Sequence, residues 1–118
     1  MLSRSRRLKS AQFNYAFTNS QSVRHSLVAL KAHWRGDDAS EVRAAFVVPK
    51  KQAKAAARNR TRRRLRERYR LHPRRDELRG CDLIFLATPA THAATSAELD
   101  AALDEVLRRV VRAHKNRQ

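Results

Sequence analysis

The sequence predicts one α+β domain, an α/β sandwich in which helices pack on a small mixed sheet, with the element order α-β-β-α-β-α. Three observations support this fold class. Apolar residues recur at helical spacing in two long segments, a near-continuous apolar run of strand length lies between them, and two shorter strand-like runs come before the first. At 118 residues the chain has the length of one domain, so we expect residues 1–118 to form a single unit.

The chain is strongly basic, with a formal net charge of +16 and a pI near 11.6. A field of this size attracts nucleic acid or an anionic membrane. The membrane is the weaker choice, because the sequence holds no apolar run long enough to cross a bilayer. Residues 1–9 are basic and expected to be flexible, and no apolar signal region follows them. We therefore expect a cytoplasmic protein that binds nucleic acid.

Ser10 is expected to cap a short first helix that carries Phe13 and Phe17. A spacing of four residues puts both rings on one side of this helix, and Tyr15 lies on another side. On the residues alone, burial in a core is the favoured role of the two phenylalanines, and stacking on nucleic-acid bases is the alternative.

Two strands are expected next. Ser26 to Trp34 and Val42 to Val48 have strand composition, and the turn residues Gly36-Asp37-Asp38 lie between them. This arrangement predicts an antiparallel hairpin. Pro49 lacks a main-chain N–H donor, so it ends the second strand.

A basic helix is expected from Gln52 to Leu71. Between Lys50 and Arg75 the chain holds 13 Lys or Arg residues and a single acid, Glu67, so this helix repels itself unless a polyanion neutralises it. Arginines at four-residue spacing stack on one side, and a second stripe is expected to pack on a core. The first set is Arg58, Arg62 and Arg66, and the second is Ala53, Ala57, Thr61, Leu65 and Tyr69.

The rest of the chain is predicted to be a strand and a closing helix. The near-continuous apolar stretch Cys81 to Ala87 predicts a strand buried on both faces, with Cys81 as a buried structural thiol. Strand, helix and strand together imply a parallel crossover. Thr95 and Glu98 form a capping box at the start of the last helix. Its apolar stripe is Leu99, Ala102, Leu103, Val106, Leu107, Val110 and Val111.

The sequence holds no credible catalytic or metal-binding constellation of its own. Its five histidines lack paired metal-ligand spacing, its single cysteine allows no Cys/His cluster, and two glycines cannot form a Gly-rich phosphate loop. The paired acids Asp37-Asp38 and Asp76-Glu77 are expected to be solvated turn residues. We expect no catalytic residue and no metal site in the protein.

The ordered combination of an apolar strand, Lys50-Lys51, a six-residue spacer, Arg58-Asn59-Arg60 and a following basic pair resembles the protein subunit of bacterial ribonuclease P. The remaining matching residues are Arg62, Arg63, Arg66 and Glu67. The resemblance covers nearly the whole chain. Thr61 departs from it, since isoleucine is usual at this position in the family.

This resemblance implies a fold with a left-handed β-α-β crossover, like that of the second domain of ribosomal protein S5. It implies a subunit that assists the magnesium-dependent, endonucleolytic removal of the 5′ leader from precursor tRNA. Catalysis then belongs to the RNA subunit, with Mg²⁺ bound mainly by RNA, and the implied partners are that RNA and precursor tRNA rather than DNA or a membrane.

The resemblance also implies two groups of binding residues. Contacts to the catalytic RNA are expected from Arg58, Asn59, Arg60, Arg62, Arg63 and Arg66. Contacts to the leader are expected from Phe13, Phe17, Val48, Lys50 and Lys51. The main alternative function is a non-enzymatic RNA-binding protein, such as a ribosomal protein or an RNA chaperone. A DNA-binding regulator and a protein-only nuclease are further alternatives.

Overall fold

The computed structural model describes residues 9–35 and 42–116, with the backbone alone for residues 74–76 and 116. Its longer elements are α1 (Ser10–Thr18), β1 (Gln21–Arg24), β2 (Val28–Trp34), β3 (Arg43–Val47), α2 (Ala55–Arg70), β4 (Cys81–Ala87) and α3 (Ser96–Asn116). Short 3₁₀ helices lie between some of them, namely η2 (Lys50–Gln52), η3 (Pro73–Leu78) and η4 (Pro89–Ala93). The basic segment 1–8 and the expected turn at 36–38 lie outside the described residues.

The described strands form one mixed sheet in the order β1-β2-β4-β3. β2 is antiparallel to both of its neighbours, and β3 is parallel to β4. The expected parallel crossover through α2 is therefore confirmed. The expected hairpin between residues 26–34 and 42–48 is wrong, because β4 lies between these two strands. The apolar side chains of β4 need cover on both faces and neighbours on both edges, and this requirement places β4 in the middle of the sheet.

The antiparallel partner of β2 is β1, a four-residue strand that the sequence did not reveal. Val23 is its one buried side chain, so β1 carries almost no apolar signal. The main-chain N–H of His25 donates to the main-chain oxygen of Val28 at 3.0 Å and closes a tight turn. Ser26 and Leu27 belong to this turn, so β2 begins two residues later than expected.

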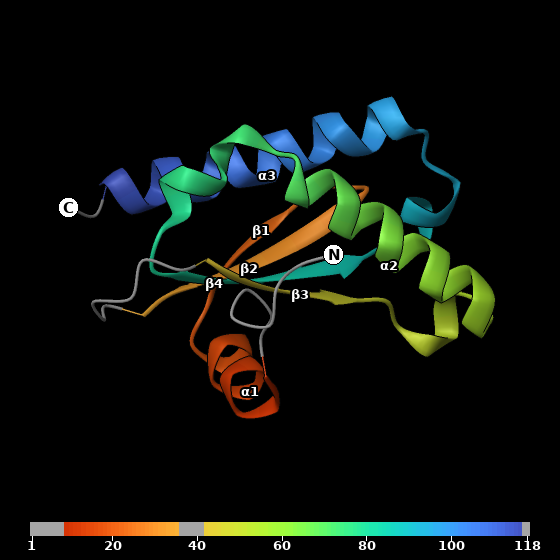
Figure 1. Cartoon of the computed structure of the whole chain (residues 1–118), viewed down its shortest axis with the longest axis horizontal. Coiled ribbons are helices and arrows are strands. Elements are labelled where there is room, and N and C mark those ends of the chain that lie inside the picture. Colours follow the sequence, from red (N-terminus) through yellow and green to blue (C-terminus); the bar gives the residue numbers. More distant parts are fainter. Residues whose placement is uncertain (1–8, 36–41, 117–118) are drawn as a thin grey trace.

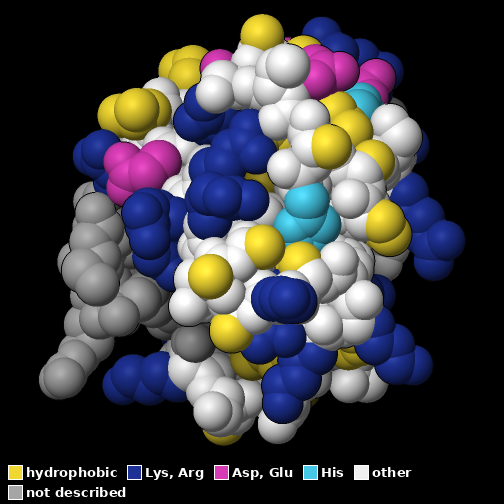
Figure 2. Space-filling model, turned by 90° about the vertical axis from the view of Figure 1, so that its right-hand side faces the viewer, with side chains coloured by type: hydrophobic (Ala, Val, Ile, Leu, Met, Phe, Trp, Pro, Cys, Tyr) yellow, Lys and Arg dark blue, Asp and Glu magenta, His cyan; other side chains and the backbone are white. Residues whose placement is uncertain are grey.

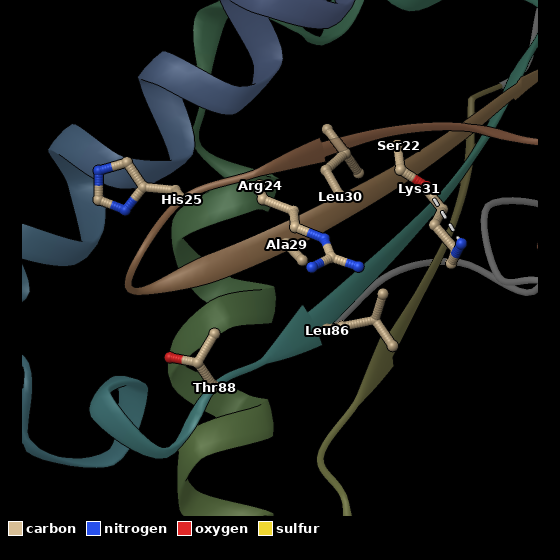
Figure 3. Close-up of a pocket in the computed structure, with 8 residues that line it drawn as sticks. All are labelled: Ser22, Arg24, His25, Ala29, Leu30, Lys31, Leu86 and Thr88. Carbon is tan, nitrogen blue, oxygen red and sulfur yellow. Dashed lines mark hydrogen bonds between the residues drawn. The ribbon is translucent and has the colours of Figure 1, made fainter.

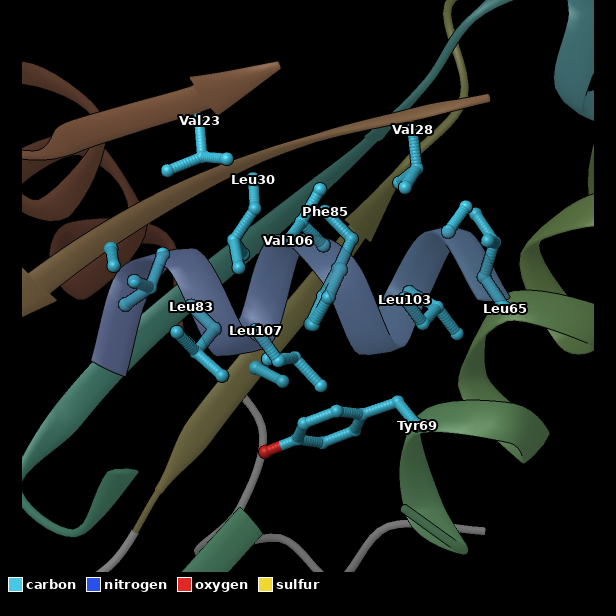
Figure 4. Close-up of a cluster of buried hydrophobic side chains, with 14 of the residues drawn as sticks. Val23, Val28, Leu30, Leu65, Tyr69, Leu83, Phe85, Leu103, Val106 and Leu107 are labelled. Carbon is cyan, nitrogen blue, oxygen red and sulfur yellow. The ribbon is translucent and has the colours of Figure 1, made fainter. Parts of the chain in front are cut away.

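The sheet separates two layers of helices, with α1 on one face and α2 and α3 on the other (Figure 1). Alternate side chains of the strands face opposite layers. Leu30 and Phe85 pack among the residues of α2 and α3, as Figure 4 shows. Ile84 is fully buried on the opposite face, where α1 contacts β4. The two-sided burial expected of β4 is thus confirmed.

Packing holds the basic helix α2 in place. Leu65 and Tyr69 are buried against Leu103 and Leu107 of α3 and the sheet (Figure 4). Burying one leucine stabilises the fold by about 1.5–3 kcal/mol, whereas a like-charge pair one turn apart costs only about 0.2–0.5 kcal/mol. The burial of one leucine therefore outweighs the repulsion within one such pair. The apolar stripe expected for α3 is buried in full.

The ends of the helices differ from the expectations at two points. α2 begins at Ala55 rather than Gln52, because residues 50–52 form the η2 turn and Lys54 has the extended backbone of an N-cap. In α1 the N-cap is Lys9 rather than Ser10, and its main-chain N–H donates to Gln12 Oε1 at 3.0 Å. The capping box of α3 is confirmed by reciprocal hydrogen bonds of 2.8 and 3.1 Å between Thr95 and Glu98.

Candidate nucleic-acid interface

Arg58, Arg62 and Arg66 of α2 form one row, which lies along β3 and η2. Arg62 Nε donates to the main-chain oxygen of Phe46 at 3.2 Å, and the Arg66 guanidinium lies 5.9 Å from the centre of the Phe46 ring. Arg58 Nη1 lies 3.4 Å from the main-chain oxygens of Lys50 and Ala53. The one-sided row is as the sequence predicted. A guanidinium has five N–H donors, so each of these half-buried arginines keeps donors for an anion.

Arg60 and Arg63 are in a different situation. Both side chains are exposed, and no hydrogen bond or ion pair ties either one to the described part of the chain. Their positive charge is therefore not neutralised by any described residue. Of the six residues assigned to the catalytic RNA, these two are the most available to a partner.

Asn59 has a role inside the protein as well. Its Oδ1 accepts a hydrogen bond of 2.8 Å from Arg62 Nη1, which holds the Arg62 side chain against the helix. Because the amide oxygen is used in this way, the amide hydrogens of this exposed side chain are the groups left for RNA.

The remaining arginines of α2 are engaged in the fold. Arg64 donates to the main-chain oxygen of Ala94, and Arg68 forms an ion pair of 3.4 Å with an aspartate of α3. Arg70 Nη2 lies 3.0 Å from Glu67 Oε2, and this hydrogen bond lowers the pKa of the Glu67 carboxyl. The arginines of α2 therefore fall into three groups: those in the row along β3, those that are exposed, and those whose side chains contact other parts of the fold.

Figure 2 views the molecule from the end that carries η2 and the start of α2. Lys and Arg side chains form a band across this face, with hydrophobic side chains between them, and Asp and Glu lie near its margin. The face around the start of α2 is therefore predominantly basic, with apolar side chains interspersed.

On the other face of the sheet, the rings of Phe13 and Phe17 stack with their centres 5.8 Å apart. Phe17 is 42% exposed, and Lys31 Nζ of β2 lies 4.7 Å from the centre of its ring. Tyr15 is more exposed and lies against His33 on another side of α1. The shared side of the two phenylalanines is confirmed, and neither ring belongs to the main core.

A cleft of about 260 Å³ lies on the same face of the sheet (Figure 3), and one of its lining residues, Lys31, contacts the Phe17 ring of α1. Its floor includes Ala29 and Leu86, and Arg24 and Lys31 stand at its margin. Lys31 Nζ also donates to Ser22 Oγ at 3.1 Å. The cleft therefore combines an apolar floor with a basic margin, which suits an unpaired base and its phosphate. Arg24 and Lys31 carry no signal in the sequence, because their proximity depends on β1 and on its register with β2.

Lys50 and Lys51 are exposed in η2, at the end of the sheet where this cleft lies. Val47 of β3 is paired with Leu86 on the cleft floor, and η2 follows three residues later. Val48, in contrast, is 5% exposed and belongs to the core under α2 and α3. Its side chain is not available to a leader on the α1 face, since it faces the opposite layer of the sandwich.

A buried carboxylate lies under the start of α1. Asp82 is 2% exposed, Arg43 binds both of its oxygens at 2.7 and 2.8 Å, and Arg35 binds one at 2.7 Å. Two guanidinium groups surround one carboxylate, so this group is engaged and offers no open position to a hard cation such as Mg²⁺.

Comparison with known proteins fits this geometry. Residues 2–111 match the family model described as Ribonuclease P. The chain is 38% identical to the ribonuclease P protein component of Gluconacetobacter diazotrophicus, over 92% of this chain and 94% of that protein. The chain belongs to the ribonuclease P protein family. A relative with the same description, from a Mycobacterium species, is 39% identical over 80% of this chain and 81% of its own length.

Solved structures of ribonuclease P proteins share the fold. The Staphylococcus aureus protein superposes with a TM-score of 0.77 at 22% identity, covering 92% of this chain and 96% of its own. The Thermotoga maritima protein gives a TM-score of 0.72 at 22% identity, covering 87% and 96%. The α+β architecture of this ribonuclease P protein is therefore that of its structural relatives.

Family membership decides between the functions considered from the sequence. This ribonuclease P protein is the protein component of a ribonucleoprotein endonuclease that acts in tRNA processing. The holoenzyme of this family depends on magnesium, and the described residues bring together no group of three or more His, Cys, Asp or Glu side chains that could hold a metal ion. No helix in the described ranges is long and apolar enough to span a bilayer.

Proposed function

We propose that this ribonuclease P protein uses its two basic faces for two different RNAs. The α2 face, with Arg58, Asn59, Arg60, Arg62, Arg63 and Arg66, binds the catalytic RNA. The α1 face holds the single-stranded 5′ leader of precursor tRNA. The observation that carries this proposal is the separation of the two surfaces by the sheet, with uncompensated arginines on one side and an exposed aromatic ring beside a cleft on the other.

Phosphate binding by α2 is supported by the state of its side chains. Arg60 and Arg63 have no partner in the described protein, so an RNA phosphate replaces only water around them. The row along β3 is already oriented by contacts with Phe46 and η2, and an oriented guanidinium loses less entropy when it binds. Each phosphate contact should change the salt slope of log K by about −0.7 to −0.9.

Leader binding is supported by the exposed Phe17 ring and the cleft beside it. Stacking of an unpaired base on an aromatic ring contributes about 1–3 kcal/mol and tolerates any base. Phe13 supports Phe17 from within α1, and Lys31 places a positive charge above the ring. Lys50 and Lys51 supply further charge at this end of the sheet. We retain these residues for the leader and replace Val48, which is buried, by Lys31.

The protein contributes binding rather than a catalytic group. Asp82, the carboxylate buried most deeply on the α1 face, is held by two arginines, so the described residues do not fit magnesium. We assign the magnesium chemistry to the RNA subunit. The partners proposed are ribonuclease P RNA and precursor tRNA, without DNA or membrane, in the cytoplasm.

The test is cleavage of a precursor tRNA by a bacterial ribonuclease P RNA at low magnesium, with and without this protein. We expect the protein to restore cleavage, and we expect the effect to fade as the leader is shortened. Restored cleavage that does not depend on leader length would contradict the leader-binding half. Binding to RNA without any restored cleavage would contradict the proposal as a whole.

Variants separate the two faces. Phe17→Ala should weaken binding of precursor tRNA while leaving affinity for the RNA subunit unchanged, and the double change Arg60→Gln and Arg63→Gln should do the reverse. Arg79→Gln, an exposed arginine just before β4, is the control for loss of charge.

A further inference from the structure

A basic surface at the β1 edge of the sheet joins the two faces of the molecule. β1 is an outer strand. Because His25 and Val28 form a hydrogen-bonded pair at the turn, the main-chain groups of Arg24, opposite Ala29, point away from β2. Arg109 of α3 occupies this outward position, and its Nη1 donates to the main-chain oxygen of Arg24 at 2.9 Å.

Arg24 and Arg109 extend the basic margin of the cleft around the β1 edge. The Arg24 side chain lies on the α1 face, where it lines the cleft together with Lys31 (Figure 3). Arg109 reaches the same point from α3, which packs on the opposite face. Arg112 follows Arg109 by three residues and shares its side of α3, and both are exposed. We call Arg24, Arg109 and Arg112 the β1-edge surface.

The acid beside this surface is already engaged. Glu105 lies one turn before Arg109, and its carboxylate is 3.3 Å from Nε2 of His25. The Nδ1 atom of His25 accepts a hydrogen bond of 3.0 Å from the main-chain N–H of Leu27, so the ring hydrogen lies on Nε2, toward Glu105. In the described part of the chain, no ion pair neutralises an arginine of the β1-edge surface.

We propose that the β1-edge surface binds phosphates of the single-stranded leader where the strand leaves the cleft. This inference rests on the proposed function, in which the leader occupies the cleft. Arginine forks match phosphate oxygens, so we assign this contact to the phosphate backbone, which makes it independent of base identity. The α2 row lies along β3, the opposite outer strand, which leaves the β1 edge for the substrate.

The proposal makes the contact depend on leader length. A short leader ends inside the cleft, whereas a longer one continues across Arg24 to Arg109 and Arg112. Loss of two phosphate contacts should reduce the salt slope by about 1.4 and weaken binding on the order of tenfold at physiological salt.

The experiment uses the holoenzyme reconstituted with ribonuclease P RNA, and precursor tRNAs whose leaders are shortened one nucleotide at a time. Affinity and its salt dependence are measured for the natural protein and for the double change Arg109→Gln and Arg112→Gln. Arg112→Gln alone removes one charge but keeps the hydrogen bond from Arg109 to Arg24. A loss of affinity in this variant therefore reflects the charge and not a change in local structure. Arg79→Gln removes an exposed charge just before β4, at the end of this strand away from the cleft, and is the control for loss of charge.

We expect the double variant to lose affinity for long leaders only, Arg112→Gln to show part of this loss, and Arg79→Gln to behave as the natural protein. Equal loss with short leaders or with mature tRNA would overturn the proposal, and so would weaker binding of the RNA subunit. If the natural protein shows no dependence on leader length, the proposed function itself fails. If it shows that dependence and the variants keep it, only the β1-edge contact fails.

Discussion

The hydroxyl oxygen of Thr61 lies 2.8 Å from Nδ1 of His92, and this contact joins the middle of α2 to η4. Nε2 of His92 lies 2.9 Å from Gln52 Oε1, and Gln52 Nε2 donates to the main-chain oxygen of Ala87. Since Gln52 Oε1 accepts, the pattern assigns the ring hydrogen to Nε2, and Nδ1 accepts from Thr61. A polar chain thus connects η2, α2 and the end of β4.

Thr61→Val should destabilise the protein by about 1–3 kcal/mol, because the half-buried Nδ1 of His92 loses its donor while the volume at residue 61 is kept. Urea denaturation measures the change. The double variant Thr61→Val with His92→Phe removes both polar partners, so its loss should be clearly smaller than the sum of the two single losses. Strict additivity would show that the contact contributes nothing.

The arginines of α2 should divide into two classes when replaced by glutamine. Arg60→Gln and Arg63→Gln should lower the salt slope of RNA binding by about 0.7–0.9 each without changing the melting temperature. Arg62→Gln should lower RNA affinity and also destabilise the fold by about 0.5–1.5 kcal/mol, since it removes the hydrogen bond to Phe46. Thermal melting and salt-dependent binding distinguish the classes, with Arg79→Gln as the control. Equal melting temperatures for all variants would contradict the division.

Cys81 should not react with a thiol reagent while the protein is folded. Its side chain is fully buried, and burial raises the pKa of the thiol, so the nucleophilic thiolate does not form in the native state. Labelling at about pH 8 should be negligible in buffer and complete in denaturant. Because the native pKa of the thiol is raised, the stability that its burial contributes is fully present below the unfolded pKa of about 8.5. This contribution decreases as the pH rises above that value. Cys81→Ala should remove that dependence.

Glu98 should contribute to stability above the acid range. The main-chain N–H of Thr95 donates to its carboxylate and, with the Thr95 hydroxyl, lowers the pKa of Glu98. The sign follows from the lowered native pKa: the contribution is present above the ordinary pKa of glutamate, about 4.3, and is lost as the pH falls through the native value. Unfolding curves of the natural protein and Glu98→Ala should converge at low pH. A constant difference at every pH would contradict this.

Local patterns predicted the elements with strong periodicity. The apolar stripe of α3 and the apolar run of β4 are local sequence patterns that predict burial by themselves, so both elements were predictable. The pairing of β2 was not recognised, because a pairing depends on which distant strand competes best for the same edge. β1 contributes one buried side chain, Val23, and its position follows from the tight turn at His25 and not from its own composition.

The candidate site was predictable in residue type but not in detail. The sequence indicates a helix rich in arginine, and only the structure shows that Arg62 and Arg64 bind main-chain oxygens while Arg60 and Arg63 are exposed. Val48 was misplaced because a strand alternates its faces, and one residue of register decides which layer a side chain enters.

On each outer strand, an arginine from a helix donates a hydrogen bond to a main-chain oxygen. Arg62 donates to Phe46 of β3, and Arg109 donates to Arg24 of β1. An open strand edge is a template for pairing with a second molecule, and a charged, bulky side chain on that edge opposes such pairing. The two guanidinium groups therefore lie where they oppose pairing of these edges with a second sheet. A variant that lacks both arginines would present two strand edges without this charged cover.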